Sequence, residues 1–593
     1  MTRRVTGTAL AAVLTLTGLD AAAVADDVSV EQATAARPVA EQEPDLARGL
    51  IVRTTTGSPS SAVLAATDTA LGEGIAVAGD DRLVPRISTV DFDEVVDGAA
   101  AEAVAAQVER RDDVVWAIPN RLRRIETRAP VTTNDPLFRQ QRNLWDTSSS
   151  RRGGYSIKAP ALWRATKGSP STVVAVIDTG IVAHPDLAGR TVAGYDFIKN
   201  ATLARDGDGR DADPTDRGDW NVDGQCPYEG GAASSWHGTF VAGQIAASAN
   251  NRTGISGVAP NVKVQPIRAL GRCGGWDSDI LDSITWASGG SVRGVPANPT
   301  PAPIVNLSFG GMAPSASERK AACRVYDAIA KAGRARGSVF IAAAGNEGDN
   351  ANRMIPASCS EYVSVGATSR KGFSSIYSNV GSTVDLSAPG GDTTVDGRKD
   401  SILSLGNTGR RRAGSSTYVR YEGTSMAAPQ VAGAAALLHG LGFTTPSALR
   451  SALYASVSPF RPRSSTYARK RVRIDGETYR ADLNCTSGRR KWCGRGLLDL
   501  GRVQAPVGTP TVSGTASVGG TLRASAVAWV SAPRGIAQTW RADGAVVGRG
   551  PVYRPTAADV GRRLTVTVSP ASGVFARIGT TSAPTAVVTA PAA

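Results

Sequence analysis

Four short apolar runs, separated by stretches of helical periodicity, most constrain what this chain can fold into. They occupy residues 173–177, 262–267, 304–307 and 339–344. Runs that are apolar at most positions fit strands buried on both faces, and such strands occur in parallel sheets covered by helices. We therefore expect an α/β domain built on an open parallel sheet, with ligands bound at the carboxyl ends of its strands.

A serine at the start of a helical run is the first candidate for chemistry. Ser425 lies between the flexible pair Gly423-Thr424 and the helix-forming residues 426–429. Unpaired N–H groups at a helix N-terminus favour developing negative charge, which suits a nucleophilic serine. Such a serine also needs a base, and the base needs a carboxylate to orient it.

Three histidines are available as that base. His237 lies within residues 235–243, a segment in which small side chains recur one helical turn apart. Such a segment can form a helix that packs closely against its neighbours. His184 precedes a proline in a polar turn and His439 ends an apolar helix, so we interpret both as structural residues. His237 is the predicted base.

The orienting carboxylate is expected at the end of a strand. Asp178 directly follows the apolar run 173–177, and Gly180 permits a sharp turn away from it. Aspartic proteases share the triplet Asp-Thr-Gly, but they need two copies and an all-β fold, and we find one copy. The chain order is therefore Asp178, His237, Ser425.

These motifs and their order resemble the subtilisin-like serine proteases. The resemblance implies a subtilisin-like parallel-sheet catalytic domain and an acyl-enzyme formed on Ser425. It also implies that Asn346, in residues 343–348, donates its amide to the tetrahedral oxyanion beside the Ser425 N–H. The alternative for Asn346 is a turn residue without a function.

The same resemblance implies a substrate cleft for protein or peptide substrates. Its edges would be a strand that pairs with an extended peptide and a glycine loop opposite, and the wall residues imply a roomy, uncharged pocket for medium or large P1 side chains. Asp277 and Asp279 could add a preference for basic residues, but loop or cap roles are favoured. The implied cleft residues are Gly275, Ser308, Phe309, Gly310, Ala343 and Gly345.

An acidic, glycine-containing segment covers residues 206–219. Calcium takes six to eight oxygen ligands from flexible loops of this kind, although the segment is not an EF-hand because its sixth position is Asp211. Some extracellular members of the resembled family carry a similar insertion. We select Asp208, Asp211, Asp213 and Asp219 as ligands of a structural calcium ion, against the alternative of a solvated acidic loop.

Cysteine content and net charge restrict the compartment in which the chain can work and the partners that it can bind. Six cysteines, an even number, fit an oxidising compartment, and sequential pairing is one of 15 connectivities: Cys226–Cys273, Cys323–Cys359 and Cys485–Cys493. The net charge of +14 raises nucleic-acid binding as an alternative. The arginines are scattered and no nucleic-acid motif accompanies them, so we expect a solvated basic surface and no nucleic acid.

The N-terminal region carries targeting and accessory signals. Residues 1–25 have the charged start, apolar middle and small-residue end of a secretory signal peptide. Residues 26–130 follow a β-α-β-α-β order, with one strand expected at 83–90, and look like an inhibitory propeptide; an unrelated binding domain is the alternative. The polar linker 126–135 is the expected processing site. We expect a secreted, extracellular zymogen without a later membrane span.

The amino-acid composition changes after the catalytic domain, which we expect at residues 131–504. Residues 505–593 contain short Thr/Val/Ser-rich strands with glycine and proline turns, which resemble an Ig-like β-sandwich without chemistry of its own. We expect it to contact a cell wall or surface, and expect a monomer. A surface-tethered enzyme is disfavoured because residues 589–593 lack a hydrophobic tail. A wall-binding protein with an inactive protease scaffold is the alternative from another functional class.

Overall fold

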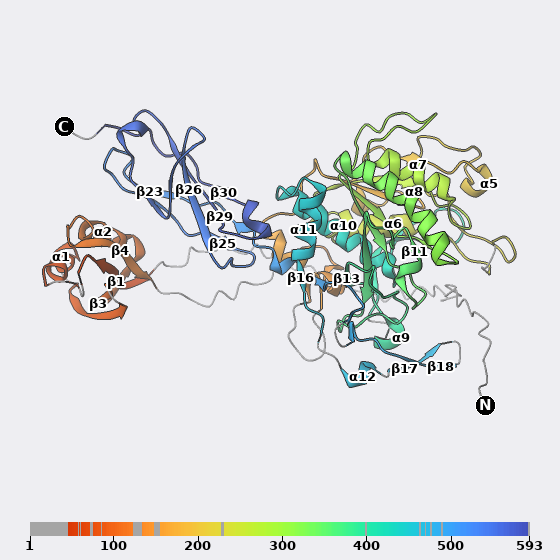
Figure 1. Ribbon diagram of the computed structural model, residues 1–593, viewed down its shortest axis with the longest axis horizontal. Helices are drawn as coiled ribbons and strands as arrows, with labels where there is room; N and C mark the ends of the chain where they lie inside the picture. The colour runs from red at the N-terminus through yellow and green to blue at the C-terminus, as the bar shows by residue number, and fades with distance from the viewer. Residues whose placement is uncertain are drawn as a thin grey trace. The chain divides into compact units, whose positions relative to one another are not determined.

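A computed structural model describes residues 46–590, apart from gaps at 57–58, 60, 72–74, 85, 122–132, 147–154, 227–229, 398–399, 462–463, 469, 475–476 and 488–489 (Figure 1). The chain divides into two compact units, one formed by Ala21–Ala129 and the other mainly by Pro130–Ala593. The expected signal peptide and most of the expected processing linker lie outside the described residues.

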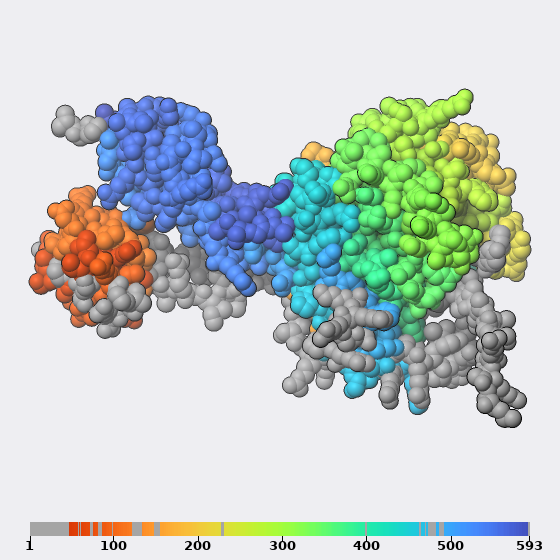
Figure 2. All heavy atoms as spheres, viewed as in Figure 1, coloured from red at the N-terminus to blue at the C-terminus, as the bar shows by residue number. Residues whose placement is uncertain are grey.

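The N-terminal unit is a four-stranded antiparallel sheet in the order β2-β3-β1-β4 with two helices. Leu50, Val90 and Val104 lie in its apolar core, and Figure 2 shows the described atoms of the unit in red to orange. Its elements are β1 (Leu46–Thr54), α1 (Ser61–Leu71), β2 (Val77–Val84), β3 (Ile87–Asp97), α2 (Gly98–Val108) and β4 (Val114–Arg121).

The expectation of one strand at 83–90 is wrong, because β2 and β3 form a hairpin there. Val84 pairs with Ile87 across the turn, and Arg86 adopts the left-handed conformation at φ 67°. The chain reverses between the paired residues Val84 and Ile87, and the strand pattern continues on both sides of this turn. The unit therefore has one strand more than the sequence pattern indicates.

The second unit is built on a nine-stranded sheet in the order β16-β21-β13-β12-β10-β8-β5-β7-β6. Its strand pairs are parallel except for β16 with β21. The parallel α/β architecture expected from the apolar runs is thus confirmed. The strands are β5 (Val173–Asp178), β6 (Tyr195–Asp196), β7 (Lys263–Arg268), β8 (Ile304–Leu307), β10 (Val339–Ala343), β12 (Tyr362–Thr368), β13 (Leu386–Pro389), β16 (Val457–Ser458) and β21 (Leu497–Leu498).

Alternate residues of β5 enter two separate cores, one on each face of the sheet. Val174 and Val176 pack with α6 (His237–Ala246), α10 (Thr424–Gly440) and α11 (Pro446–Ala455). Ala175 and Ile177 pack with α7 (Asp277–Ala287) and α8 (Ala316–Ala335), which lie side by side in Figure 1. The two-residue period of a strand fixes this division. Because the strands are parallel, their carboxyl ends and the starts of the helices that follow them meet at one edge of the sheet.

The remaining elements of this part are short. They are α3 (Arg142–Trp145), α4 (Ala159–Trp163), α5 (Ala201–Ala204), α9 (Thr393–Asp396), α12 (Ser465–Ala468), β9 (Gly311–Met312), β11 (Met354–Ile355), β14 (Ile402–Asn407), β15 (Ser416–Tyr421), β17 (Lys470–Ile474), β18 (Glu477–Ala481), β19 (Thr486–Ser487) and β20 (Arg490–Lys491), with single 3-10 turns at Phe138–Gln140, Pro185–Leu187, Ala351–Arg353 and Leu500–Arg502. None of the helices in the described part of the chain has the length and apolar character needed to cross a lipid bilayer.

The C-terminal region is all-β, as expected. Trp540 and Tyr553 stack with ring centroids 5.7 Å apart in its core. Phe575 also packs edge-on against Phe443, which follows α10. The domain boundary expected between residues 504 and 505 stays a prediction. The strands are β22 (Pro506–Val507), β23 (Val512–Gly514), β24 (Leu522–Ala524), β25 (Ala528–Trp529), β26 (Ile536–Ala542), β27 (Ala545–Arg549), β28 (Val552–Tyr553), β29 (Leu564–Pro570) and β30 (Thr580–Thr581), with 3-10 turns at Ala557–Asp559 and Val574–Arg577.

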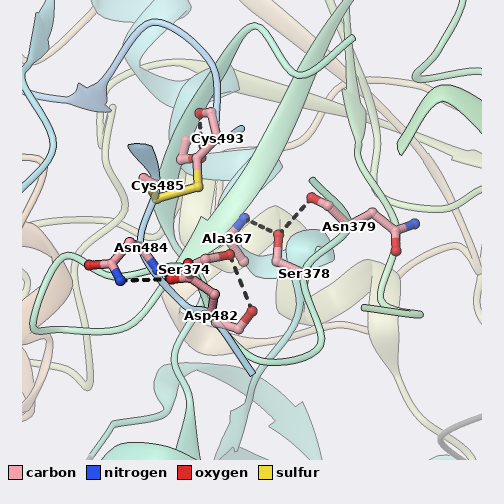
Figure 3. The surroundings of a disulfide bond; sticks show 10 residues. Ala367, Ser374, Ser378, Asn379, Asp482, Asn484, Cys485 and Cys493 are labelled. Carbon is pink, nitrogen blue, oxygen red and sulfur yellow. Dashed lines mark hydrogen bonds between the residues drawn. A yellow bond between two sulfur atoms is a disulfide. The ribbon is translucent and has the colours of Figure 1, made fainter. Parts of the chain in front are cut away.

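Three disulfides join cysteines that are consecutive in the sequence: Cys226–Cys273, Cys323–Cys359 and Cys485–Cys493. Figure 3 shows the last of these beside residues 374–379, where Ser378 Oγ accepts a hydrogen bond from Ala367 N at 2.9 Å. Asn484 next to this disulfide donates to Asp482 Oδ1 at 2.7 Å. The loop that this disulfide closes is also held by a hydrogen bond from Trp492 N to the carbonyl oxygen of Cys485 at 3.1 Å.

Candidate active site

The sheet places Asp178 and His237 in direct contact. Asp178 is the last residue of β5 and its side chain is fully buried, while His237 is the first residue of α6. His237 Nδ1 lies 2.8 Å from Asp178 Oδ1 and 3.0 Å from Oδ2. A carboxylate at Nδ1 favours the tautomer with its proton there, so the Nε2 lone pair is left to accept a proton.

Two glycines let the start of α6 approach the end of β5. A Cβ on Gly238 would lie 2.1 Å from the carbonyl oxygen of Gly180, which excludes any side chain at that position. Gly180 has φ of 89°, a left-handed conformation that glycine adopts without strain. The glycine expected to turn the chain after Asp178 does so, and a second glycine provides the close contact.

Ser425 lies in the first turn of α10, beside the end of β8. Its hydroxyl donates a hydrogen bond to the carbonyl oxygen of Ser308 at 2.7 Å. Gly423, the residue before the helix, has φ of 154°. The nucleophile candidate therefore stands at a helix N-terminus, where unpaired N–H groups stabilise negative charge.

Asn346 is oriented by the residue before the nucleophile. Its Oδ1 accepts hydrogen bonds from Thr424 N and Thr424 Oγ1, both at 2.8 Å. A Cβ built on Gly423 would lie 3.5 Å from Asn346 Nδ2 and 3.6 Å from Ser425 N. Two nitrogens that carry N–H donors thus lie near the same point beside Gly423, where they could bind an oxyanion.

The electrostatics of His237 suit a base. Burial alone would lower the pKa of His237, but the negative charge of Asp178 and the hydrogen bond to it outweigh burial and raise the pKa above 6.5. More distant carboxylates, Asp219 and Asp216, act in the same direction. The protonated imidazole that forms during proton transfer is therefore stabilised.

The other two histidines have structural contacts. His184 Nδ1 accepts from Asp186 N at 3.2 Å, and its Nε2 contacts the carbonyl oxygen of Thr417 at 3.1 Å. His439 Nδ1 lies 3.1 Å from Thr172 Oγ1. Burial lowers the pKa of both histidines.

The expected cleft residues lie around these groups, but the space beside two of their glycines is filled. Ser308, Ala343 and Gly345 are buried, whereas Phe309 is half-buried and Gly310 and Gly275 are exposed. Met354 fills the space beside both glycines of the expected pocket wall: a Cβ would lie 2.6 Å from its Sδ at Gly310 and 2.1 Å from its Cε at Gly345. The glycines make room for Met354, which sequence reasoning missed because it follows no motif.

Two acidic residues near the cleft are engaged with other groups. Asp277 Oδ1 accepts a hydrogen bond from Tyr326 Oη at 2.6 Å, and Asp279 pairs with Arg210 at 2.9 Å. Asp277 is exposed at the start of α7, which agrees with the interpretation as a loop or cap residue. Asp279 is buried in the first turn of the same helix and is neither an exposed loop residue nor its cap.

The four aspartates chosen as calcium ligands do not form one site. Asp213 pairs with Arg217 at 2.5 Å, and Asp219 accepts hydrogen bonds from Ser235 N and Oγ at 2.7 and 2.6 Å. Within the described ranges, no three His, Cys, Asp or Glu side chains converge as metal ligands do. Asp213 is paired with a cation and both oxygens of Asp219 accept hydrogen bonds, so these two do not fit the ligand set. Asp211 accepts one hydrogen bond, from Asp213 N to its Oδ1 at 2.6 Å.

Comparisons with known proteins agree with this geometry. Residues 169–474 match the model of the Subtilase family, Peptidase S8. The chain is 40% identical over 385 residues to an extracellular protease of Xanthomonas campestris pv. campestris, which covers 64% of this chain and 62% of that protein. It is 37% identical over 475 residues to the extracellular basic protease of Dichelobacter nodosus, covering 77% and 74%.

A solved structure of a protease from Pseudoalteromonas arctica superposes with a TM-score of 0.52 at 39% identity. The match covers 62% of this chain and 97% of that one.

Proposed function

Because this chain belongs to the subtilase family, we propose that it is a secreted serine endopeptidase that hydrolyses peptide bonds of proteins through an acyl-enzyme on Ser425. The observation that carries the proposal is the 2.8 Å contact between Asp178 and His237 at the edge of the sheet where α10 presents Ser425. The two donors beside Gly423 supply the oxyanion site that acyl transfer needs.

The proposed reaction assigns roles to Asp178, His237, Ser425 and Asn346. Asp178 holds the tautomer of His237, and His237 Nε2 takes the proton of Ser425 Oγ as this oxygen attacks the peptide carbonyl carbon. Asn346 Nδ2 and Ser425 N–H donate to the resulting oxyanion. His237 then gives the proton to the leaving amine, and a water molecule hydrolyses the acyl-enzyme by the same proton path in reverse.

Substrate binding uses the strand edge at the cleft. Residues Ser308, Phe309 and Gly310 leave the sheet at the carboxyl end of β8, and their backbone would pair with an extended peptide. Gly275 forms the opposite edge, and Ala343 and Gly345 line the position next to Met354. A P1 side chain of medium or large size requires the flexible Met354 side chain to move aside.

Export and activation complete the proposal. Two relatives are named extracellular proteases, and the three disulfides suit the same environment. The unit within residues 26–130 acts as an inhibitor and chaperone in the uncut chain, and cleavage within 126–135 releases it. The β region from 505 onward contacts a cell wall or surface, and the mature enzyme is a monomer.

A structural calcium ion in the acidic segment is part of the proposal, with a reduced ligand set. Asp208 and Asp211 have no cation within salt-bridge distance among the described residues, and Asp206 Oδ1 is buried without a hydrogen-bond partner. Oxygen-rich loops of this kind suit calcium. The ion would stabilise the segment, and no step of the reaction depends on it.

The proposal is tested by comparing the purified, processed protein with its Ser425→Ala variant on an unfolded protein substrate. The wild type should release peptides and the variant should not. N-terminal sequencing of the wild type should place the new terminus within 126–135. Peptide release by the variant at the wild-type rate, or binding to cell walls by a wild type without hydrolysis, would contradict the proposal.

A further inference from the structure

The acidic segment contains two carboxylates that contact the neighbours of the catalytic pair. Asp216 is buried, and its Oδ2 accepts a hydrogen bond from Thr179 Oγ1 at 2.7 Å while its Oδ1 accepts from Gly218 N at 2.8 Å. Thr179 directly follows Asp178. The hydroxyl proton of Thr179 therefore points at Asp216, and its oxygen lone pairs face elsewhere.

Those lone pairs face the start of α6. Thr179 Oγ1 accepts a hydrogen bond from Gly238 N at 3.0 Å. One hydroxyl thus joins the residue after Asp178 to the residue after His237, and Asp216 sets the direction of that hydroxyl.

Asp219 makes a second connection of the same kind. It accepts from Ser235 N and Ser235 Oγ, and Ser235 Oγ in turn accepts from His237 N at 3.2 Å. The first N–H groups of a helix have no partner within the helix. Here two consecutive ones, His237 N and Gly238 N, are satisfied by hydroxyls that two carboxylates orient.

We propose that Asp216 and Asp219 are positioning residues for catalysis, which act through the hydroxyls of Thr179 and Ser235 to hold His237 against Asp178. The inference rests on the proposed function of that pair. It assigns a role to an insertion whose acidic residues the sequence associates with a metal. Neither carboxylate touches the substrate in this scheme.

The rate of the reaction should depend on the distance between His237 and Asp178. The 2.8 Å contact between Nδ1 and Oδ1 joins the end of a strand to the start of a helix, so it depends on the relative position of two elements. A displacement of about 1 Å of a catalytic group can lower the rate about 10²-fold. Loss of either connection should therefore lower kcat and leave KM nearly unchanged, because the cleft residues are untouched.

The experiment measures kcat, KM and thermal stability of the processed enzyme on a peptide substrate. Thr179→Val and Asp216→Asn should lower kcat about 10- to 100-fold with KM within about threefold. Thr179→Ser keeps the hydroxyl and should stay within about threefold of the wild type. Ser235→Ala tests the second connection, with Ser235→Thr as its conservative partner.

A matched control is Asp223→Asn, an exposed carboxylate four residues after Asp219, which should leave kcat unchanged. Retention of wild-type kcat by Thr179→Val and Ser235→Ala would overturn the inference, as would equal losses in Thr179→Ser and Thr179→Val. Should Asp216→Asn fail to fold, the Ser235 pair decides the result by the same readout. A wild type without activity would instead contradict the proposed function itself.

Discussion

The hydroxyl of Ser425 donates its hydrogen bond to the carbonyl oxygen of Ser308, 2.7 Å away. Among the hydrogen bonds of the described residues, none joins Ser425 to His237. For His237 to act as the base, the hydroxyl must turn from β8 toward the imidazole. Since Ser308 also begins the edge that would pair with a substrate, nucleophile and cleft are connected by one short contact.

Asn346 should contribute to kcat and little to KM. Replacing it with Ala removes the amide donor, and loss of one such donor in subtilisin, the type member of this family, costs about 10²–10³ in kcat. The replacement also removes the acceptor of Thr424, so Asn346→Asp is the matched variant because it keeps that acceptor and lacks the donor. Steady-state kinetics of both variants checks this. Asn346→Asp at the wild-type kcat would show that the amide does not bind the oxyanion.

The acid limb of the activity profile should lie above pH 6.5. His237 must be neutral to accept a proton, and Asp178 raises its pKa above that ordinary value. Activity should therefore fall as the pH decreases through the raised pKa, which kcat/KM measured against pH records. His184 and His439 cannot produce this limb because burial lowers their pKa values. A limb centred below 6.5 would contradict the assigned electrostatics.

The disulfide that closes the longer loop should stabilise the fold more, because loop-closure entropy grows with the logarithm of loop length. Cys323–Cys359 closes a loop of 36 residues and Cys485–Cys493 one of 8. In the chain-entropy model these contribute about 4 and about 2.5 kcal/mol. Double Cys→Ser variants of each pair, unfolded with guanidinium, measure the two losses. A larger loss at Cys485–Cys493 would show that local contacts in the native state outweigh loop closure there.

Calcium removal should destabilise the enzyme without altering the chemistry. If an ion binds near Asp208 and Asp211, excess EDTA should lower the melting temperature by about 5 °C or more. The Asp208→Asn variant should show a smaller decrease on chelation than the wild type. An unchanged melting temperature in EDTA would remove calcium from the account.

Local patterns predict the sheet and the elements that carry the catalytic residues, because apolar runs and helix starts are properties of neighbouring residues. Asp178 ends β5, and Ser425 lies in the first turn of α10, as expected. The partners of Asp219 could not be predicted in this way, because Ser235 lies 16 residues away across an irregular segment. The many aspartates of the segment indicate a bound cation, whereas in the fold the hydroxyl of Ser235 donates to Asp219.

The space beside Gly310 and Gly345 shows the same limit. Two glycines in a sequence indicate room for a ligand or a close contact, and cannot distinguish between them. Met354 comes from a separate short strand and fills that space. Only the three-dimensional arrangement decides which interpretation holds.

The central claim, that Ser425 forms the acyl-enzyme, is tested most directly by covalent labelling. The processed protein is incubated with a serine-directed fluorophosphonate, digested and analysed by mass spectrometry, with His237→Ala and heat-unfolded protein as controls. We expect one adduct, on Ser425, formed at least about 10³-fold more slowly in His237→Ala and absent from unfolded protein. Folded, processed protein that carries no adduct on Ser425 would contradict it.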